Sequence, residues 1–590
     1  MDWYLRRLFD FGRAVTRWYN DRRYGVLATR LGRGEPAPDG RRGFVIIQID
    51  SLAYDYVWEA MARGAMPYLR SLVEQEGYTL LEWRCGIPST TPAVQSGIMY
   101  GNNWDVPAFR WYEKDVQLSV VSKVPALVRR IQQRVSRGRP GILTGGSSYS
   151  NLMDGGAALS LLTLGALSSQ RLFANARGMG WFLLFLLNPI RLARIIAATL
   201  WEYLRSLWER AASQFRPGRR RALNVVSPFL QTLVNIVLRE VQTFGVMLDM
   251  YLGVPAIYVN YLGYDEVAHQ EGVLHPESLR VLRGIDARLR EIDRARRRYA
   301  NRSYDLFVLS GHGMTPSVTF KTLYGFTLGQ YIHSQLGPHV ALDERLGQTP
   351  SDTKEAQSLM DELAGIENNL SERGKRLANL LRRYLAERLP PDPEVGWNLQ
   401  RRGDIIVRDS GPLAHVYFNV TDQPMNLSEI AILYPDLVSR LVDHPGIGLV
   451  VGRENGEAVI ATGQGVLSLT EGGLYGPDHP LSIYGDPAYL AAELARLASF
   501  PHSGDLILLG EGNGRGEIVS FEEQWATHGG AGGPQDRPFL LLPPGIFWDL
   551  RHVRNAEDLY PFFLSLSAPA LLSPPRVAAA PPELTAALSD

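Results

Sequence analysis

Residues 41–55, RRGFVIIQIDSLAYD, decide the expected fold class. An arginine-rich lead is followed by a run of apolar, largely β-branched residues, and this run ends at Asp50. A short continuous apolar run predicts a strand buried on both faces, as in the interior of a parallel sheet. Asp50 is therefore expected just past the carboxyl end of a buried strand, where open α/β sheets bind their ligands.

Other stretches repeat this pattern of a buried strand followed by a polar turn. VPAIYVNYLGYDEVAH (254–269) and YDLFVLSGHG (304–313) are apolar runs that end in polar residues. LLEWRCGIPSTTPAVQSGIMYG (80–101) is strand-like up to Gly86 and predicts a helix beginning near Pro92, since proline is well tolerated in a first helical turn. Apolar runs that alternate with helical periodicity predict an α/β fold with a mostly parallel central sheet and helices on both faces.

The composition limits the class of protein and the compartment. The chain has 590 residues, 45% of them hydrophobic, which allows a large core with insertions or several domains. Lys and Arg together number 61, as do Asp and Glu, so the overall charge gives no signal for nucleic-acid binding. Cys85 is the single cysteine, which excludes an internal disulfide and favours a reducing, cytoplasmic location.

The chain divides by composition into a core that is interrupted twice. After about residue 335 the sequence becomes highly charged and then forms strand pairs around Gly, Asp and Asn turns, while GDLILLG (504–510) and RPFLLLPPG (537–545) resemble buried core strands. The expected divisions are a basic amphipathic segment at 1–40, the first part of the core at 41–335 with an apolar and basic helical insertion at 141–225, a mixed α/β cap or insertion at 336–503, the second part of the core at 504–575, and a loose tail at 576–590.

Two segments suggest contact with a membrane surface. Residues 1–24 predict an amphipathic helix with an aromatic face bordered by arginines, and arginines interrupt every apolar stretch, unlike in a secretory signal. The insertion at 141–225 is also unusually apolar and basic, yet Asn188 and Pro189 break its longest apolar run. Both segments are compatible with peripheral contact at the inner face of the membrane. The alternatives are a helix packed on the protein itself for 1–24 and, slightly favoured, a buried helical subdomain for 141–225.

Several polar residues at the expected strand ends have metal-binding chemistry. In the sequence DEVAH, Asp265 and His269 lie four residues apart and would share one face of a helical turn. His528 lies in the glycine-rich loop WATHGGAGG between two apolar runs, and with the previous pair it would make a three-ligand site with an open position. Asp50 and His312 would contribute to a second site. Taken singly, each histidine is more typical of a solvated or hydrogen-bonded turn residue.

Thr91 is the candidate nucleophile. A threonine hydroxyl is weakly nucleophilic near neutral pH and needs activation, which a metal ion can supply. At the start of a helix its oxygen would also lie beside free backbone N–H groups that attract phosphate. The alternative is a simple helix cap, and Ser89 and Thr90 are neighbouring candidates for the same role.

The order of these motifs resembles the alkaline phosphatase superfamily and, more narrowly, its type I phosphodiesterase/nucleotide pyrophosphatase branch. The matching segments lie within 43–113, 254–317 and 504–545, well under half of the chain. The resemblance implies an alkaline phosphatase-like fold and a hydrolase of phosphoric esters with two divalent metal ions, expected to be zinc. It further implies a metal-activated threonine nucleophile and a covalent phospho-threonine intermediate, with a phosphate ester as the substrate.

Carried over by position, the resemblance assigns each candidate a role. Thr91 matches the nucleophile, which would also contact metal. The first metal site would be formed by Asp265, His269 and His528, and the second by Asp50 and His312.

The sequence departs from the family pattern at two places. The pattern Ser-Asp-His-Gly has Gly311 where an aspartate ligand is expected, and Asp305 is a poor substitute because it lies at the other end of the same strand. Phe109 occupies the position of an asparagine that helps to bind the phosphoryl group. The candidates to replace that asparagine are Asn102, Asn103 and Arg110.

Gly311 keeps other functions open. One alternative is a degenerate member with an impaired metal site that binds a ligand without hydrolysing it. Another is different superfamily chemistry, such as phosphonate or phosphomonoester hydrolysis or phosphomutase activity. A sulfatase is disfavoured, because Cys85 does not lie at the position of the required nucleophile.

Overall fold

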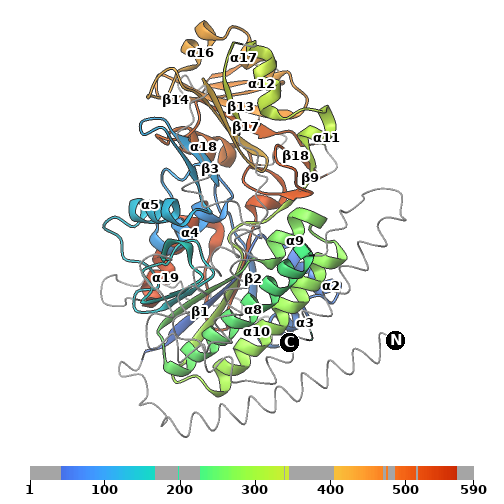
Figure 1. Ribbon diagram of the computed structural model, residues 1–590. Helices are drawn as coiled ribbons and strands as arrows, with labels where there is room; N and C mark the ends of the chain where they lie inside the picture. The colour runs from blue at the N-terminus through green and yellow to red at the C-terminus, as the bar shows by residue number, and fades with distance from the viewer. Residues whose placement is uncertain are drawn as a thin grey trace, which may run out of the picture.

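The computed structural model describes residues 41–166, 197, 226–337, 339–344, 404–468, 473–475, 481, 486–512 and 516–567. The amphipathic segment 1–40, most of the expected insertion at 141–225 and the tail 576–590 therefore lie outside the described residues. Among the described residues, no helix is both long enough and apolar enough to cross a membrane. Figure 1 shows two parts, a lower core and an upper cap.

The core is built on a seven-stranded sheet in which most neighbouring strands run parallel. Parallel pairing joins β8, β1, β7, β5 and β6, while β20 runs antiparallel between β2 and β8. The mostly parallel α/β sheet expected from the sequence is thus confirmed. In spatial order its strands are β2 (Thr79–Glu82), β20 (Phe539–Leu542), β8 (Tyr304–Leu309), β1 (Gly43–Ile49), β7 (Ala256–Tyr261), β5 (Ser147–Tyr149) and β6 (Leu159–Leu161).

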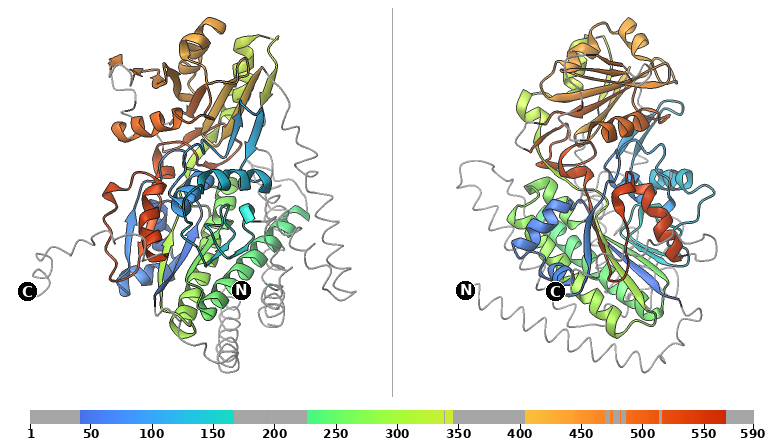
Figure 2. Two further views of the ribbon diagram at one scale, coloured as in Figure 1. Left: turned by 90° about the vertical axis from the view of Figure 1, so that its left-hand side faces the viewer. Right: turned by 180° about the vertical axis from the view of Figure 1, so that it is seen from behind.

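Helices cover both faces of this sheet because the central strand is apolar on both sides. All seven residues of β1 are buried, and alternate residues belong to different cores: Val45, Ile47 and Ile49 to one, Phe44 and Ile46 to the other. Each such side chain contributes about 1.5–3 kcal/mol on burial. The first face packs against α2 (Tyr54–Ala62), α3 (Pro67–Gln75), α8 (Val226–Leu252), α9 (Gly263–Glu271) and α10 (Pro276–Arg298), and the second against α4 (Thr91–Tyr100), α5 (Pro125–Val135) and α19 (Tyr560–Ser567) (Figures 1 and 2).

The first part of the stretch 141–225 is not the helical insertion that we expected. Residues 141–166 contribute β5 and β6 to one edge of the core sheet, followed by the short 3₁₀ helix η1 (Leu164–Ala166). Ser147, Ser148 and Tyr149 of β5 pair in parallel with β7, and β6 pairs in parallel with β5. Part of the apolar run that suggested a buried helix, Leu159–Leu161, is therefore a strand.

The cap has its own eight-stranded sheet, with helices packed against it. Its strands are β10 (Leu342–Glu344), β11 (Ile405–Ser410), β12 (Leu413–Phe418), β17 (Leu506–Gly510), β13 (Ile447–Glu454), β14 (Glu457–Thr462), β15 (Gly465–Ser468) and β16 (Gly473–Tyr475). Its helices are α11 (Phe320–Tyr324), α12 (Leu328–Leu336), α16 (Leu427–Leu433), α17 (Leu437–Val442) and α18 (Pro487–Ala498). The run GDLILLG, which we expected to return to the core, instead forms β17 and pairs with β12 and β13. A buried apolar strand does not specify which of two sheets it joins.

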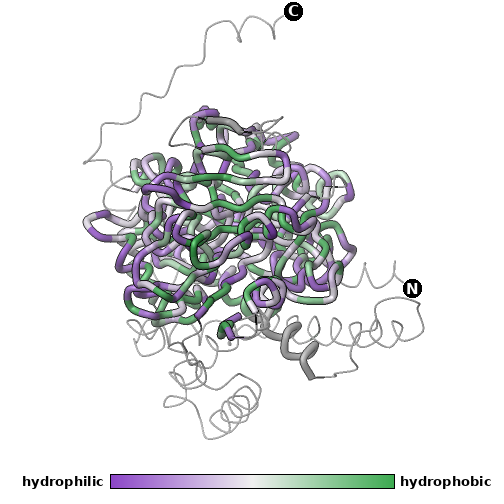
Figure 3. Tube along the Cα trace, turned by 90° about the horizontal axis from the view of Figure 1, so that it is seen from above, coloured by the Kyte–Doolittle hydropathy of each residue, from purple (hydrophilic) through white to green (hydrophobic). Residues whose placement is uncertain are grey.

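Two small sheets lie between the core and the cap. One has β9 (Thr315–Thr319) between β18 (Ile518–Ser520) and β19 (Ala526–Thr527), and the other pairs β3 (Arg110–Glu113) with β4 (Leu118–Val121). Because β9 follows the 310–314 turn and β19 precedes the glycine-rich loop at 528–533, their pairing brings these two turns together. Seen from above, apolar stretches cross the middle of the described molecule and many hydrophilic ones lie at its rim (Figure 3).

Candidate metal and nucleophile site

The expected site residues converge at the carboxyl edge of the core sheet. Asp50 directly follows β1, and His312 lies three residues beyond the end of β8. Asp265 and His269 lie on α9, which follows β7, so the predicted helical spacing of four residues is present. His528 follows β19. The topology therefore brings together side chains that are far apart in the sequence.

Asp265, His269 and His528 form a compact group. Oδ1 of Asp265 lies 3.2 Å from Nε2 of His269 and 3.4 Å from Nε2 of His528. Among the described residues, this is the group of His, Cys, Asp and Glu whose ligand atoms all lie within 4.8 Å of one another. The two imidazole rings are tilted against each other, with centroids 5.0 Å apart.

Backbone carbonyls orient these histidines. Nδ1 of His269 lies 2.8 Å from the carbonyl oxygen of Ala526, and Nδ1 of His528 lies 3.0 Å from that of Ser89. A carbonyl oxygen only accepts, so each Nδ1 carries a proton, and Nε2 is the ring atom that faces Asp265. A histidine that ligates through Nε2 while Nδ1 donates to a carbonyl is the usual arrangement in metal proteins.

The donor set of this group fits a divalent ion such as zinc. Two imidazole nitrogens and one carboxylate leave a fourth position open, as in catalytic zinc sites. Burial raises the pKa of Asp265, but the neighbouring His269 and His528 outweigh it and hold the pKa well below its ordinary value. Burial likewise opposes the charged form of His269, yet the Asp265 carboxylate raises its pKa above the ordinary value. The carboxylate is thus available as an anionic ligand.

Asp50, His312 and Thr91 form the other half of the site. Nε2 of His312 lies 3.1 Å from Oγ1 of Thr91 and 3.8 Å from Oδ1 of Asp50. Nδ1 of His312 lies 3.0 Å from the carbonyl oxygen of Gly313, so Nε2 is the acceptor for the Thr91 hydroxyl. The ring of His312 stacks on that of His528 with centroids 4.0 Å apart, which joins the two halves.

Burial shapes the charge of this second half. Burial and the negative charge of Asp265 raise the pKa of Asp50 to about 6, against the hydrogen bonds that it accepts from Gln48 and Asn260. Burial, followed by the nearby His528, holds the pKa of His312 well below its ordinary value. His312 is therefore a neutral imidazole, with a lone pair directed at Thr91.

Thr91 is the first residue of α4, as expected for a hydroxyl beside free N–H groups. The preceding Thr90 makes no side-chain capping hydrogen bond, and its hydroxyl is buried without a partner. Ser89, the other neighbouring candidate, donates to the carbonyl of Gly530 at 2.9 Å and accepts from the N–H of Gly529 at 3.0 Å. Of the three hydroxyls, that of Thr91 is the one that contacts both His312 and Asp50.

Two side chains, Val94 and Gln48, take the space beside Gly311. A Cβ atom at residue 311 would lie 3.0 Å from Cγ1 of Val94 and 3.1 Å from Nε2 of Gln48. Asp305 does not compensate, because it pairs with Arg42 at the opposite end of β8. Residue 313, by contrast, must be glycine, since a Cβ there would lie 2.0 Å from the carbonyl oxygen of Pro534.

The three residues suggested for phosphate binding have other partners. Arg110 is buried, pairs with Glu522 and donates to the carbonyl of Asp409 at 3.1 Å, which links the core to the cap. Asn102 bonds backbone groups of Val135 and Trp104. Asn103 bonds Asn555 and Arg496. The structure does not bring these side chains into hydrogen-bonding contact with Thr91.

Three polar residues of the site, Ser51, Gln48 and Asn260, were not predicted from the sequence. Ser51 donates to Asp265 and lies 3.4 Å from Nδ1 of His312. Gln48 and Asn260 face each other in register on β1 and β7, and both donate to Asp50, at 2.8 and 3.3 Å. Their signal was present, because a polar residue inside an otherwise apolar strand needs a buried partner.

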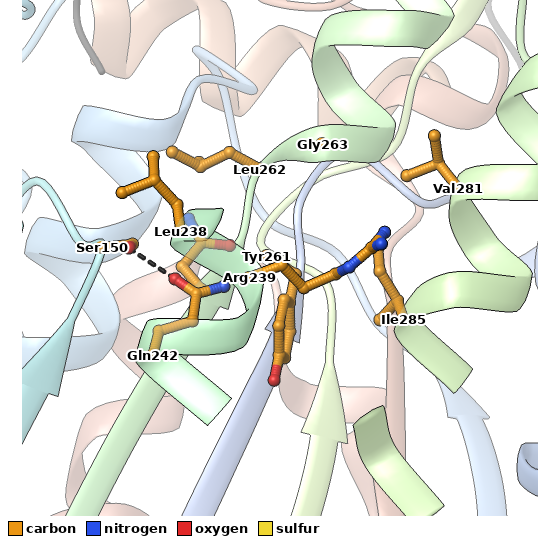
Figure 4. A pocket seen from close by; sticks show the side chains of 10 residues that line it. Ser150, Leu238, Arg239, Gln242, Tyr261, Leu262, Gly263, Val281 and Ile285 are labelled. Atoms are coloured by element: carbon orange, nitrogen blue, oxygen red, sulfur yellow. Dashed lines mark hydrogen bonds between the residues drawn. The ribbon is translucent and has the colours of Figure 1, made fainter. Parts of the chain in front are cut away.

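A pocket adjoins the site at the end of β7. Asn260 lines it together with Tyr261, Leu262 and Gly263, and the other walls come from α8, α10 and Ser150 (Figure 4). Ser150 donates to Gln242 across one side at 2.5 Å. Since Asn260 also donates to Asp50, the pocket is separated from the second half of the site by one side chain.

The family comparison supports the resemblance seen in the motifs. The family model described as type I phosphodiesterase / nucleotide pyrophosphatase matches residues 207–424, and the resemblance is thereby confirmed over this part of the chain. The match agrees with the expectation of a phosphodiesterase-type enzyme. It contains Asp265, His269 and His312 but not Thr91 or His528. No curated protein sequence matches the chain.

Several solved structures are similar at low identity. Phosphonoacetate hydrolase from Sinorhizobium meliloti 1021, in complex with phosphonoformate, is 15% identical with a TM-score of 0.42, over 90% of this chain and 96% of that one. Murine ectonucleotide pyrophosphatase / phosphodiesterase 5 is 10% identical with a TM-score of 0.41, over 89% and 95%. The human protein of the same name is 10% identical with a TM-score of 0.40, over 92% and 96%.

Proposed function

We propose that the chain is a metal-dependent hydrolase of phosphoric esters, with a phosphodiester or a pyrophosphate as substrate and Thr91 as nucleophile. The observation that carries the proposal is the Thr91 hydroxyl, placed at a helix start 3.1 Å from a neutral His312 and next to the Asp265–His269–His528 group. The family model that matches residues 207–424 supports the same class of substrate.

The residues of the chain suit an attack on phosphorus. The Thr91 hydroxyl points to two acceptors, Nε2 of His312 and Oδ2 of Asp50, at 3.1 and 3.5 Å. Transfer of its proton to His312 would leave the oxygen able to form the Thr91–phosphorus bond while the bond to the leaving alcohol breaks. Water would then hydrolyse the phospho-threonine. The first N–H groups of α4 would attract the phosphoryl oxygens.

A divalent ion, for which we propose zinc, would be held by Asp265, His269 and His528. Bound there, it would supply Lewis-acid stabilisation of the charge on the phosphoryl group. Ser51 donates to Asp265 and so orients the carboxylate.

Turnover of a chromogenic phosphodiester and a chromogenic phosphomonoester tests this function. Bis(p-nitrophenyl) phosphate should be hydrolysed in the presence of zinc, the monoester more slowly, and neither after Thr91→Ala. Trapping with acid and mass spectrometry should find phosphate on the peptide that contains Thr91. Diester hydrolysis that survives Thr91→Ala would contradict the proposal.

The contact between Gln48 and Asp50 favours a second candidate, a protein that binds phosphate esters without hydrolysing them. An amide in place of a carboxylate removes negative charge from the half of the site that holds the nucleophile. Zinc binding and ester binding without turnover of either substrate would favour this candidate over the hydrolase.

We further propose peripheral contact with the inner face of the membrane. It rests on the amphipathic sequence of residues 1–24 and on the apolar, basic composition within 141–225. Flotation with anionic liposomes should carry the full chain upward, and a chain that lacks residues 1–24 should float less. Equal sedimentation of both chains would contradict the proposal.

A further inference from the structure

Gln48 lies against Gly311, the position where the family pattern has a second acidic ligand. Its Nε2 lies 3.1 Å from the place where a Cβ of residue 311 would stand, so a carboxylate there would require Gln48, together with Val94 at 3.0 Å, to shift. The backbone of Gly311 is not in the left-handed region, and a side chain is therefore not excluded by backbone strain. The space for a side chain at residue 311 is therefore taken up by the packing of its neighbours.

The orientation of the Gln48 amide follows from its neighbours. The hydroxyl of Tyr258 donates to Oε1 of Gln48 at 2.6 Å. Nε2 of Gln95 lies 3.5 Å from the same oxygen, and Gln95 is itself oriented because its own Oε1 accepts from the backbone N–H of Leu152 at 2.7 Å. With donors on the oxygen side, the amide nitrogen must face Asp50, where it donates to Oδ1 at 2.8 Å.

This arrangement is unsuited to a cation. An amide nitrogen has no free lone pair and carries partial positive charge, so it cannot ligate a metal ion. It also engages one oxygen of Asp50, while the other accepts from Asn260 at 3.3 Å. All these groups are buried. A divalent ion between Asp50 and His312 would find one carboxylate already satisfied by hydrogen bonds, and desolvation would not be offset.

We propose that this chain binds a single divalent ion, at Asp265, His269 and His528, and that the Gln48 carboxamide takes the place of the second ion beside Asp50. The inference rests on the proposed function for the location of the first ion. It departs from the two ions that the family resemblance implies. The Nε2 lone pair of His312 then serves the Thr91 hydroxyl rather than a metal.

The test is the number of zinc ions per chain in the full-length protein. The protein is loaded with excess zinc, desalted and measured by elemental mass spectrometry, and titration calorimetry gives the affinities. We expect one ion for the natural chain, none for Asp265→Asn and one for Asp50→Asn. Two ions of comparable affinity, or loss of the ion in Asp50→Asn with retention in Asp265→Asn, would overturn the inference.

A variant that gains an ion sharpens the test. Gln48→Glu keeps the shape of the side chain and places a carboxylate against Asp50, so we expect a second zinc ion to bind. Gln242→Glu is the matched control. Gln242 is also buried, and the substitution makes the same change from amide to carboxylate away from Asp50. The Gln242→Glu variant should bind one ion. One ion in a folded Gln48→Glu would overturn the inference. If Gln48→Glu does not fold, the zinc content of the natural chain, Asp265→Asn and Asp50→Asn decides between one ion and two.

Parallel turnover of bis(p-nitrophenyl) phosphate separates this inference from the proposed function. One ion without turnover would support the single-ion site and contradict the hydrolase. Two ions with turnover would do the reverse.

Discussion

The site has two halves, and each places imidazole beside a carboxylate. The first half consists of Asp265, His269 and His528, and the second of Asp50, His312 and Thr91. In the first half, two Nε2 atoms converge on one oxygen of Asp265 at 3.2 and 3.4 Å, as in a ligand set. In the second, the oxygens of Asp50 already accept hydrogen bonds from amides, and Nε2 of His312 faces a hydroxyl. The same residue types therefore differ in what they can bind, and the difference comes from uncharged neighbours.

Replacement of the nucleophile should have the largest effect on activity. Thr91→Ala should lower kcat/KM for bis(p-nitrophenyl) phosphate by about 10⁴-fold or more, since no other hydroxyl of the described residues contacts both His312 and Asp50. Zinc content should stay the same, because Thr91 belongs to the second half. Thr91→Ser should recover part of the activity. A kcat/KM of Thr91→Ala within tenfold of the value for the natural chain would show that Thr91 is not the nucleophile.

Loss of one ligand in the first half should come next. His269→Ala removes one Nε2 of the ligand set, so we expect the chain to lose its zinc and about 10³-fold in kcat/KM. Removal of the ion from the natural chain with a chelator should give a similar loss, restored by added zinc. Full zinc content in His269→Ala would show that the ion lies elsewhere.

A change behind the second half should have a smaller effect. Tyr258→Phe removes the hydroxyl that holds Oε1 of Gln48 at 2.6 Å, and one buried hydrogen bond contributes about 0.5–1.5 kcal/mol. We therefore expect a decrease in kcat/KM of at most about tenfold, with zinc content unchanged. Loss of zinc in Tyr258→Phe would mean that the halves are not independent.

A buried histidine outside both halves should affect stability alone. His415 accepts from the N–H of Gly504 and lies 3.0 Å from the carbonyl of Pro107, so it joins cap and core. Burial lowers its pKa to about 4, and the unfolded chain binds the proton first as the pH falls below about 6.5.

The contribution of His415 to the free energy of unfolding is therefore present near pH 7 and is lost as the pH falls towards 4. By pH 4.5 this loss should be on the order of 2 to 3 kcal/mol. Urea unfolding at pH 7 and 4.5 should show a smaller difference between the two pH values for His415→Gln than for the natural chain, with zinc content and diester hydrolysis unchanged. An identical difference in both chains would show that His415 titrates normally.

The sequence predicted the central sheet and the placement of the site residues because both follow from strong local patterns. Uninterrupted apolar runs identify β1, β7 and β8, and the carboxyl ends of parallel strands meet at one edge. The same reasoning could not assign GDLILLG to the cap, since an apolar strand fits either sheet. It also misjudged residues 141–166, whose apolar side chains pack in short strands.

The role of Gln48 could not be predicted from local sequence. Its significance depends on Gly311, which is more than 260 positions away, and on donors from β7 and α4 that only the folded chain brings close. The glycine alone suggested a vacant ligand position. The structure places a neighbouring amide in that space.

The single-ion site is tested most directly by an anomalous diffraction map at the zinc edge, from crystals of the natural chain grown or soaked with zinc. We expect one strong peak, bound by Nε2 of His269, Nε2 of His528 and the carboxylate of Asp265, with Gln48 still donating to Asp50. A second peak of similar height between Asp50 and His312 would contradict it.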